Sequence, residues 1–519
     1  MKIRVNIDGY EIEAQEGATI LQIARENGIE IPTLCHDARV EAYGACGLCV
    51  VEVEGSPKLA RACATKAADG MVIHTQGERA KQARKVALEL LLSDHEGDCK
   101  APCSLNCPAG TDCQGYVGLI ANGQYREAVK LIKEKVPLPA SIGRICPHPC
   151  EQACRRKMVE DPIAIAHLKS FAADLDLRSW APYQPECAPD THRKISIVGG
   201  GPAGLTAAYF LRTMGHSVAI YDAMPKMGGM LRYGIPSYRL PREKLDAEID
   251  SILSLGIEVR TNVRIGRDIW LEELEKQFDC IYIAIGAHQD KKTGIPGEDS
   301  RNVMSAVEML KAIGDDVMPD FTGKQVVVIG GGNVAMDVTR SSIRLGASKV
   351  TCVYRRRLED MTALPDEVAG ATAEGAEMMT LAAPVRIEAD EDGVARALWV
   401  QPQIIGDVDS SGRPKPNKAA LDQVRIPADI IVVAIGQGIE IQGFDQAGVP
   451  ITRGGRLVAA LSGQVNDMDN IFAGGDCVTG PPPPSGPLPP ERWLPPTSTS
   501  TWVSTIADPG GRGHPASHG

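Results

Sequence analysis

Most cysteines of this 519-residue chain lie near its N-terminus, at spacings typical of iron–sulfur ligands. Of the 15 cysteines, 11 fall within the first 154 residues. The first residues alternate polar and apolar side chains like a strand and show no apolar signal core. We therefore expect a cytoplasmic protein, where clustered thiols bind metals or react far more often than they form disulfides.

Four of these cysteines, within the first 63 residues, have the spacing of a [2Fe–2S] site. Such a cluster takes four thiolates, and nearby glycines let backbone N–H groups approach the sulfurs. A structural zinc site is the alternative, but it usually pairs two short cysteine knuckles, and this segment has only one short pair. The predicted ligands are Cys35, Cys46, Cys49 and Cys63.

A second set of ligands follows between residues 95 and 154. Seven cysteines and one histidine make eight ligands, the number that two [4Fe–4S] clusters require. The histidine could also be an ordinary surface residue, and Cys113 a buried thiol without a metal. The predicted ligands are His95, Cys99, Cys103, Cys107, Cys113, Cys146, Cys150 and Cys154.

A glycine-rich loop between a strand and a helix predicts the first dinucleotide site. Gly199-Gly200-Gly201-Pro202-Ala203-Gly204 follows an apolar strand expected at 195–198 and opens a helix expected at 202–214. The N–H groups and the dipole of such a helix N-terminus favour a pyrophosphate. Asp222 ends the next strand, where an acid accepts a hydrogen bond from a ribose hydroxyl. The residues predicted here are Gly199, Gly201, Gly204 and Asp222.

The same construction recurs at residues 330–335, with a different end to its second strand. Gly330-Gly331-Gly332-Asn333-Val334-Ala335 lies between a strand at 325–329 and a helix at 333–345, and the strand at 349–354 leads into Arg355-Arg356-Arg357. Arginines pair with a 2′-phosphate, whereas an acid would repel it. The pattern favours NADP(H) over NAD(H); a solvated charge run is the alternative. The predicted residues are Gly330, Gly332, Asn333, Ala335, Arg355 and Arg356.

Composition excludes some classes of function. The net charge of −11 argues against non-specific binding to nucleic acid or to an anionic membrane. No window of 18 apolar residues occurs, so no membrane span is expected. The hydrolase motifs G-x-S-x-G and H-E-x-x-H are absent from the sequence, and we predict no catalytic side chain, because redox centres would carry the reaction.

The cysteine segments carry two resemblances. The first four cysteines, with Val51-Glu52-Val53-Glu54-Gly55 following, resemble the ferredoxin-like domain of the large iron–sulfur subunit of complex I and related hydrogenases. Cys99-Lys100-Ala101-Pro102-Cys103 and Gly143-Arg144-Ile145-Cys146-Pro147-His148-Pro149-Cys150 resemble the double-cluster domain of the glutamate synthase small subunit and dihydropyrimidine dehydrogenase.

That second resemblance implies interleaved ligands. One cluster would take Cys99, Cys103 and Cys154, and the other Cys107, Cys146 and Cys150. The fourth ligand of each stays open, with His95 and Cys113 as candidates. Lys169 stands about where a ligating side chain falls in those relatives.

The nucleotide-binding part resembles the same flavoproteins. Ile471-Phe472-Ala473-Gly474-Gly475-Asp476 resembles their second FAD motif, whose aspartate meets the ribityl chain. Segments 227–236 and 361–365 also match, without an independent physical argument for their roles. The resemblance implies FAD and adds Gly228, Gly229, Gly475 and Asp476 to its site.

We therefore predict a multidomain α/β protein that binds FAD, NADP(H), one [2Fe–2S] and two [4Fe–4S] clusters. Apolar strands ending in Ala-Ile-Gly at 284–286 and 434–436 suggest that the chain leaves one nucleotide domain, builds another and returns. The expected domains are a β-rich ferredoxin-like head at 1–78, a helical cluster domain at 79–190, a Rossmann-like FAD domain at 191–300 and 425–480, and an inserted Rossmann-like NADP(H) domain at 301–424.

This combination resembles the NADP-binding subunits of NADP-dependent formate dehydrogenases over residues 1 to about 480. The resemblance implies a hetero-oligomer in which this chain reduces NADP+ with electrons from a molybdenum- or tungsten-containing formate dehydrogenase alpha subunit. A diaphorase subunit of a hydrogenase, transhydrogenase or glutamate synthase-type complex is the alternative. A cluster-bearing redox sensor or scaffold is an alternative of another class.

Residues 481–519 form a different kind of segment. They hold 11 prolines without apolar periodicity, so they cannot form the helix that follows the second FAD motif in the resembled flavoproteins. We expect either a flexible Pro-rich tail or a shift of the deduced reading frame near Gly480.

Overall fold

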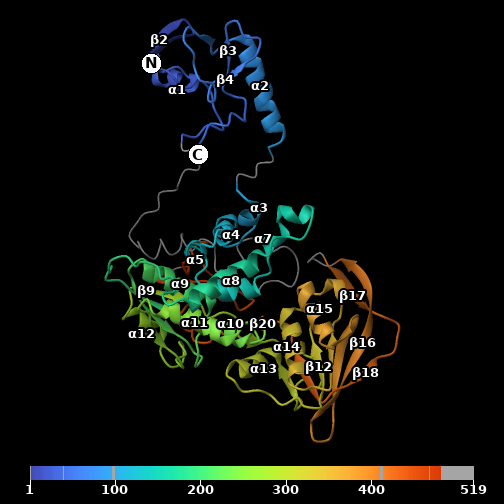
Figure 1. Cartoon of the computed structure of the whole chain (residues 1–519). Helices are drawn as coiled ribbons and strands as arrows, with labels where there is room; N and C mark the ends of the chain where they lie inside the picture. Colours follow the sequence, from blue (N-terminus) through green and yellow to red (C-terminus); the bar gives the residue numbers. More distant parts are fainter. Residues whose placement is uncertain (1, 39, 96–99, 409–412, 467, 481–519) are drawn as a thin grey trace. The chain divides into compact units, whose positions relative to one another are not determined.

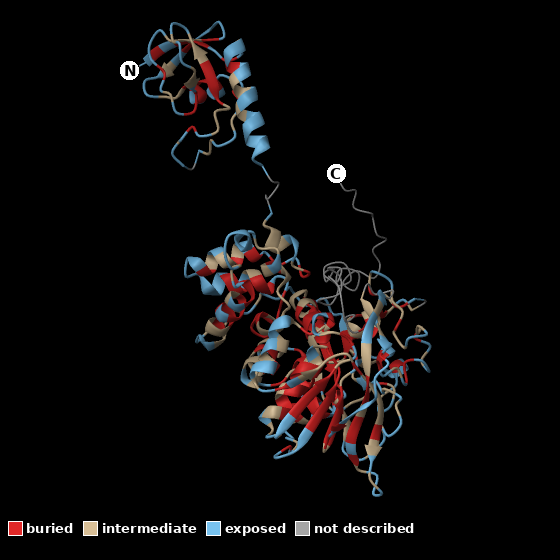
Figure 2. Cartoon of the chain, turned by 90° about the vertical axis from the view of Figure 1, so that its right-hand side faces the viewer, coloured by how far each residue is buried: buried red, intermediate tan, exposed pale blue. Residues whose placement is uncertain are grey.

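The computed structural model describes residues 2–38, 40–95, 100–408, 413–466 and 468–480 (Figure 1). The chain separates into two compact units, Met1–Lys100 and Ala101–Gly519, and each has its own buried core (Figure 2). Cys99 and the predicted tail lie outside the described residues. The domain boundaries given above stay predictions.

The N-terminal unit is built on a mixed five-stranded sheet with the order β2-β1-β5-β3-β4. Alternating Ile3, Val5 and Ile7 bury one face of the first strand, as expected for a sheet covered on one side. Its elements are β1 (Lys2–Ile7), β2 (Tyr10–Gln15), α1 (Ile20–Glu26), β3 (Val50–Val53), β4 (Ala60–Arg61), β5 (Val72–His74) and α2 (Glu78–Ser93).

The second unit begins with a helical segment. Its elements are α3 (Pro102–Leu105), α4 (Cys113–Ala121), α5 (Tyr125–Lys133), α6 (Pro139–Ile145), α7 (Pro149–Gln152), a short 3₁₀ turn (Arg155–Met158) and α8 (Ile165–Arg178). Helix α4 begins at Cys113, because the Asp112 carboxylate accepts a hydrogen bond from Gly115 N at 2.9 Å. Side-chain capping of this kind extends a helix beyond its apolar pattern.

A parallel sheet of order β21-β9-β6-β7-β8 follows. Four of the five residues in β6 and in β7 are buried, as expected for strands with helices on both faces. The strands are β6 (Lys194–Val198), β7 (Ser217–Tyr221), β8 (Glu258–Arg260), β9 (Cys280–Ile283) and β21 (Ile471–Ala473). The helices are α9 (Pro202–Thr213), α10 (Met230–Tyr233), α11 (Arg242–Leu253), α12 (Leu271–Glu275) and the short α16 (Asp476–Thr479).

A second parallel sheet, of order β11-β19-β12-β13-β14, is inserted between β9 and β21 of the first, which confirms the predicted insertion. Its strands are β11 (Val303–Ser305), β12 (Gln325–Ile329), β13 (Lys349–Val353), β14 (Glu377–Met379) and β19 (Ile430–Val433), with helices α13 (Ala306–Gly314), α14 (Asn333–Arg344) and α15 (Pro365–Ala373). A short 3₁₀ turn (Leu358–Asp360) precedes α15.

An antiparallel sheet, which the sequence did not lead us to expect, covers part of the inserted domain (Figure 1). Its strands are β15 (Ala382–Ala389), β16 (Ala395–Val408), β17 (Pro414–Lys418) and β18 (Val424–Pro427). The chain crosses between the two nucleotide domains through a two-stranded ribbon of β10 (Gln289–Asp290) and β20 (Gln437–Gly438).

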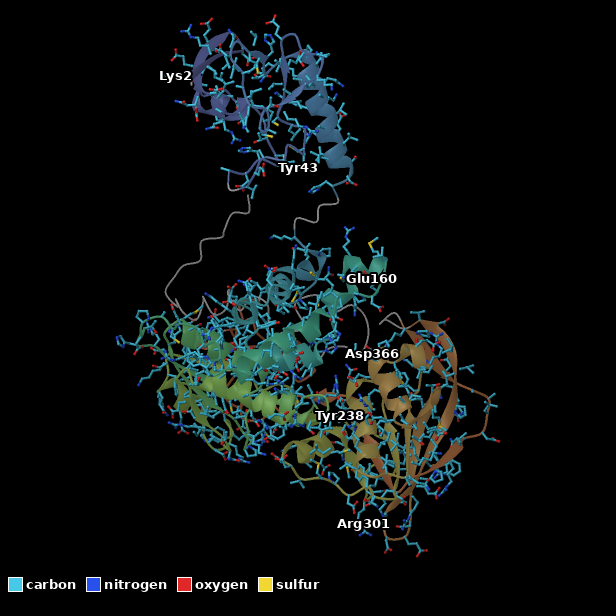
Figure 3. The ribbon with its side chains drawn as sticks, viewed as in Figure 1. Lys2, Tyr43, Glu160, Tyr238, Arg301 and Asp366 are labelled. Carbon is cyan, nitrogen blue, oxygen red and sulfur yellow. The ribbon has the colours of Figure 1, made fainter. Side chains whose placement is uncertain are left out.

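A buried ionic cluster joins the two parallel-sheet domains near Tyr238, which Figure 3 labels. Arg239 Nη1 lies 2.8 Å from Asp337 Oδ2, and Arg239 Nε lies 3.0 Å from Glu367 Oε1. The Arg340 guanidinium stacks over the Tyr238 ring at 4.7 Å. Because these groups are largely buried, the cluster fixes the orientation of one domain against the other.

Two glycine-to-alanine exchanges should have opposite effects on stability. A Cβ at Gly204 would lie 1.9 Å from Gly199 O, whereas one at Gly118, on the exposed face of α4, would meet nothing within 4 Å. Gly204→Ala should therefore destabilise the second unit by about 1–3 kcal/mol or more. Gly118→Ala should stabilise it by about 0.5–1 kcal/mol. Thermal unfolding and bound-flavin content of the two variants check this; equal melting temperatures would contradict it.

Candidate iron–sulfur and nucleotide sites

The four N-terminal cysteines form two contacting pairs. Cys49 Sγ lies 3.3 Å from Cys63 Sγ, and Cys35 donates a hydrogen bond to the Cys46 sulfur. A [2Fe–2S] cluster takes two thiolates on each iron, so the pairing fits the predicted cluster. Among the described residues, no three His, Cys, Asp or Glu side chains are grouped as for a single metal ion.

Backbone N–H groups surround the sulfur of Cys46. Burial raises the pKa of this thiol, but hydrogen bonds from the backbones of Leu48, Cys35 and Leu34 outweigh it and lower the pKa to about 7. Gly44 and Gly47 adopt φ angles of +67° and +72° on the same loop. Such left-handed turns let several N–H groups point at one sulfur, and they stabilise a thiolate there.

In the second unit, Cys113 lies between two other predicted ligands. Its thiol is hydrogen-bonded to both Cys107 and Cys150, and these bonds, with burial, raise its pKa. The hydrogen bond from Cys113 is the main reason that the pKa of Cys107 falls to about 5 and that of Cys150 is lowered. Cys146 is close enough for the charge of Cys150 to raise its pKa, although burial is the larger cause. Cys113 thus contacts Cys107 and Cys150, and Cys146 lies near enough to feel the charges of Cys150 and Cys107. Together they supply four thiols, the number that one [4Fe–4S] cluster needs.

The other predicted cluster is described only in part. Cys103 and Cys154 are half-buried in the second unit, and Cys99 lies outside the described residues. His95 is exposed just after α2, in the N-terminal unit. The roles of Cys99, Cys103, Cys154 and His95 stay predictions.

A cavity of about 450 Å³ opens at the carboxyl ends of the first parallel sheet. Cavities of this kind sit where parallel strands end. Six of the residues predicted for FAD line it: Gly199, Gly201, Asp222, Gly229, Gly475 and Asp476. Gly204 and Gly228 do not line it; Gly204 allows α9 to pack directly on the Gly199 carbonyl.

The repeated Ala-Ile-Gly segments have a common structural reason. A Cβ at Gly199 would lie 2.4 Å from Ala284 O, and one at Gly330 would lie 2.3 Å from Ala434 O. In each nucleotide domain, the first loop glycine thus packs against the end of the neighbouring strand. The sequence echo marks two copies of one strand–loop contact.

Asp222 stabilises the first glycine loop. Its Oδ2 accepts a hydrogen bond from Gly200 N at 2.6 Å, and its Oδ1 accepts one from Met224 N at 2.7 Å. Burial raises the pKa of the Asp222 carboxyl. Each oxygen keeps a second lone pair that is available to accept a hydrogen bond from a ribose hydroxyl. The ribose contact of Asp222 stays a prediction.

Asp476 lines the same cavity from the start of α16. Burial alone raises the pKa of its carboxyl to about 6. A carboxyl in such surroundings gains from a hydroxyl that donates to it, and a ribityl chain offers such hydroxyls. The surroundings of Asp476 therefore fit the contact with the ribityl chain of FAD that the resemblance implies.

The segments 227–236 and 361–365, which match the resembled flavoproteins, pack on the glycine loops. Gly228 N donates to Gly200 O at 2.9 Å. In the second domain, Thr362 N and Ala363 N donate to Gly331 O at 2.9 and 3.1 Å, and Leu364 N donates to Asn333 Oδ1 at 2.8 Å. Both segments hold a nucleotide loop in shape. Asn333 thus positions that loop, while Ala335, which is fully buried, packs behind it.

The three arginines after β13 differ sharply in their surroundings. Arg355 is exposed, Arg356 is only 4% exposed, and Arg357 forms ion pairs with Asp360 and Glu359 at 2.9 and 3.3 Å. The positive charges of Arg413, Arg356 and Arg355 all act on the Tyr354 hydroxyl. The basic surface at this loop therefore centres on Arg355, with Arg413 added by the β16–β17 connection, which sequence reasoning missed.

Residues far from the glycine motifs complete the cavity wall. They are Ile142 and Ile145 of α6, together with Arg264, His288, Glu440 and Gln442. One signal was available in the sequence: Ile145 directly precedes the predicted cluster ligand Cys146. The others lie in segments without a motif.

Family comparisons agree with this arrangement. The profile of the pyridine nucleotide-disulphide oxidoreductase family matches residues 193–494, a 2Fe–2S cluster-binding domain matches 1–78, and the 4Fe–4S domain II of dihydropyrimidine dehydrogenase matches 94–180. The chain belongs to the pyridine nucleotide-disulphide oxidoreductase family. It is an iron–sulfur flavoprotein that uses FAD and NADP(H), which confirms the predicted kinds of cofactor.

Three relatives are each similar to this chain over 73% of its length. The beta subunit of the NADP(+)-dependent formate dehydrogenase of Moorella thermoacetica is 36% identical over 73% of this chain and 57% of its own length. The beta subunit of the NADPH-Fe(3+) oxidoreductase of Geobacter sulfurreducens is 36% identical over 73% and 60%. The small chain of the Escherichia coli NADPH glutamate synthase is 31% identical over 73% and 84%. The chain thus spans less than two thirds of the first two.

Among solved structures, Mycobacterium tuberculosis FprA in complex with NADPH has a TM-score of 0.50. It is 20% identical and covers 62% of this chain and 85% of its own. This likeness shows the fold alone. No helix in the described part of the chain is long and apolar enough to cross a membrane.

Proposed function

We propose that this chain is the electron-transfer subunit that reduces NADP+ with electrons from a partner catalytic subunit. We further propose that the partner is a molybdenum- or tungsten-containing formate dehydrogenase alpha subunit, in a cytoplasmic hetero-oligomer. The ligand and nucleotide-contact roles assigned above to individual residues belong to the same proposal.

One observation carries it: a single helix links the flavin cavity to a cluster site. Ile142 and Ile145 of α6 line the cavity, and the residue that caps the end of α6 is Cys146. A predicted cluster ligand is therefore bonded directly to a residue of the cavity wall. This arrangement supports a short path for electrons between FAD and a [4Fe–4S] cluster.

Helix α6 is also held from its other end. The buried Glu248 of α11 accepts hydrogen bonds from Ala140 N at 2.5 Å and Ser141 N at 2.8 Å. These N–H groups have no partner within the helix, so a carboxylate there stabilises its first turn. The flavin domain thus fixes the register of the helix that leads to Cys146.

The residues of the chain supply position and electrostatics. When bound, FAD would exchange a hydride with the nicotinamide and single electrons with iron–sulfur clusters. The Gly199 and Gly330 loops would each hold a pyrophosphate on a helix N-terminus. Apolar side chains of α6 line the cavity beside the cluster site.

The comparisons support the formate partner only by similarity. The Moorella relative is named as the beta subunit of a formate dehydrogenase, and the Geobacter relative as part of an NADPH-Fe(3+) oxidoreductase. A diaphorase subunit of a different complex is therefore the second candidate, favoured by the Escherichia coli glutamate synthase small chain.

Purification of the native complex under anaerobic conditions tests the partner. We expect formate-dependent NADP+ reduction and copurification of a large subunit containing molybdenum or tungsten. Hydrogen- or ferredoxin-dependent NADP+ reduction without formate activity would overturn the formate assignment and retain the electron-transfer role. A complex without any NADPH turnover would overturn both and favour a redox sensor or scaffold.

The burial of Glu248 predicts a pH dependence of stability. Burial raises the pKa of its carboxyl from 4.5 to about 7. The folded chain therefore binds this proton more tightly than the unfolded chain does. The resulting stability is present below pH 4.5 and is lost as the pH rises through about 7, with a limit of about 3 kcal/mol.

Thermal unfolding of Glu248→Gln between about pH 5 and pH 8 measures this contribution. The variant should show a weaker fall of melting temperature with rising pH than the parent chain. Glu243→Gln is the control, because Glu243 lies on the same helix without being buried. Identical pH profiles for the parent chain and the Glu248 variant would contradict the assignment.

A further inference from the structure

One buried lysine in the cluster domain has no acidic partner among the residues that the structure describes. Lys169 is 5% exposed, on the face of α8 that also buries Ile165, Ala166, Ala172 and Ala173. Among the described residues, no carboxylate lies within ion-pair distance of its ammonium group. By contrast, the buried Lys133 donates to Tyr183 O and Ser251 Oγ, both at 3.4 Å, and feels the charges of Glu248 and Asp176.

Lys169 lies close enough to the cysteine segment for its charge to act on the thiols of Cys107, Cys146 and Cys150 and on the imidazole of His148. The backbone explains this placement, because a Cβ at Gly143 would lie 2.7 Å from Ser170 N and 2.8 Å from Ala166 O. Helix α6 thus packs directly on the turn of α8 that carries Lys169, and its C-cap Cys146 lies beside that turn.

Burying an ammonium group away from water is costly unless an anion compensates it. Among the described residues the nearby carboxylate of Glu151 accepts a hydrogen bond from Ala166 N at 2.9 Å and lies 3.5 Å from His148 Nδ1, so it is not paired with Lys169. The four thiols Cys107, Cys113, Cys146 and Cys150 lie in the same segment. A [4Fe–4S] cluster with four thiolates carries a net negative charge, and each added electron increases it. The lysine and such a cluster would therefore compensate each other, and the reduced state would gain more than the oxidised state.

We propose that Lys169 is the fixed positive counter-charge of the cluster held by these four cysteines, and that it raises the reduction potential of that cluster. The step it favours is the entry of one electron, in which no bond forms or breaks and no proton moves. This inference rests on the proposed electron-transfer function and specifies how the cluster nearest the flavin cavity is tuned to exchange electrons with it.

A redox titration of the intact, cofactor-loaded chain, followed by electron paramagnetic resonance, tests the proposal. Lys169→Met should retain its iron content and lower the midpoint potential of one [4Fe–4S] cluster. We expect about a tenfold shift of electrons away from that cluster, which corresponds to about 59 mV for a one-electron couple. Lys169→Arg should keep the parental potential, as should Lys157→Met, which removes an exposed lysine of the same domain.

Two results would overturn the proposal. Unchanged potentials in both Lys169→Met and Lys169→Gln would show that the charge does not act on a cluster. Loss of iron in Lys169→Arg as well as in the neutral variants would show a ligating or packing role instead. Chemical mediators set the potential in this titration, so its outcome is independent of whether formate, or any partner, supplies electrons to the chain.

Discussion

Replacing Cys113 with alanine is expected to remove one [4Fe–4S] cluster, so that the iron content falls by about four atoms per chain. Cys113 is 1% exposed and its thiol contacts both Cys107 and Cys150. Sequence spacing left this cysteine open between a ligand and a buried thiol without a metal. Its central position among the other thiols makes it the best-placed fourth ligand.

Cys280→Ala is the matched control, since Cys280 is also buried but lies in β9, in the core of the flavin domain. That variant should keep its full iron content. Flavin reduction by NADPH should survive in both variants, whereas electron flow from NADPH to an iron–sulfur-dependent acceptor should fall only in Cys113→Ala. An unchanged iron content in Cys113→Ala would remove Cys113 from the ligand set.

Replacing Arg355 with alanine is expected to lower kcat/KM for NADPH by about one to two decades while changing NADH little. A hydrogen bond to a charged group contributes about 1.5–3 kcal/mol, and only NADPH offers the 2′-phosphate to this side chain. Arg355 is suited to this role because it is exposed and directly follows Tyr354, whose ring packs against Gly331 of the second glycine loop. Steady-state kinetics with both nucleotides measure the effect.

Arg357→Ala provides the control, because Arg357 is already paired with Asp360 and Glu359. It should leave the NADPH/NADH preference close to that of the parent chain. Arg356 is a poorer target, since a side chain only 4% exposed would report packing as well as phosphate binding. An unchanged preference in Arg355→Ala would contradict the assignment of the 2′-phosphate site.

The local elements followed from sequence periodicity. Apolar strands next to glycine loops predicted β6, β12 and β13 to within one residue at each end, because a buried parallel strand must be apolar throughout. The inserted domain followed from the repeated Ala-Ile-Gly ends. The antiparallel sheet of β15–β18 escaped prediction, because its residues carry no glycine motif and its burial pattern is irregular.

Side-chain roles within the candidate site depended on tertiary contacts. Arg355, Arg356 and Arg357 are identical in type and adjacent in sequence, yet one is exposed, one buried and one paired. Spacing also could not show that Ile142 and Ile145 reach the flavin cavity. That contact depends on Glu248, which is more than one hundred residues away in sequence and fixes the start of α6.

Counting NADPH after complete reduction tests the central claim most directly. A chain reduced anaerobically, freed of excess reductant and mixed with NADP+ should hold about five electrons, two on FAD and one on each of three clusters. If the clusters and the nicotinamide exchange electrons through FAD, about two NADPH should form per chain while the clusters reoxidise. Formation of only about one NADPH, with the clusters still reduced, would contradict the account.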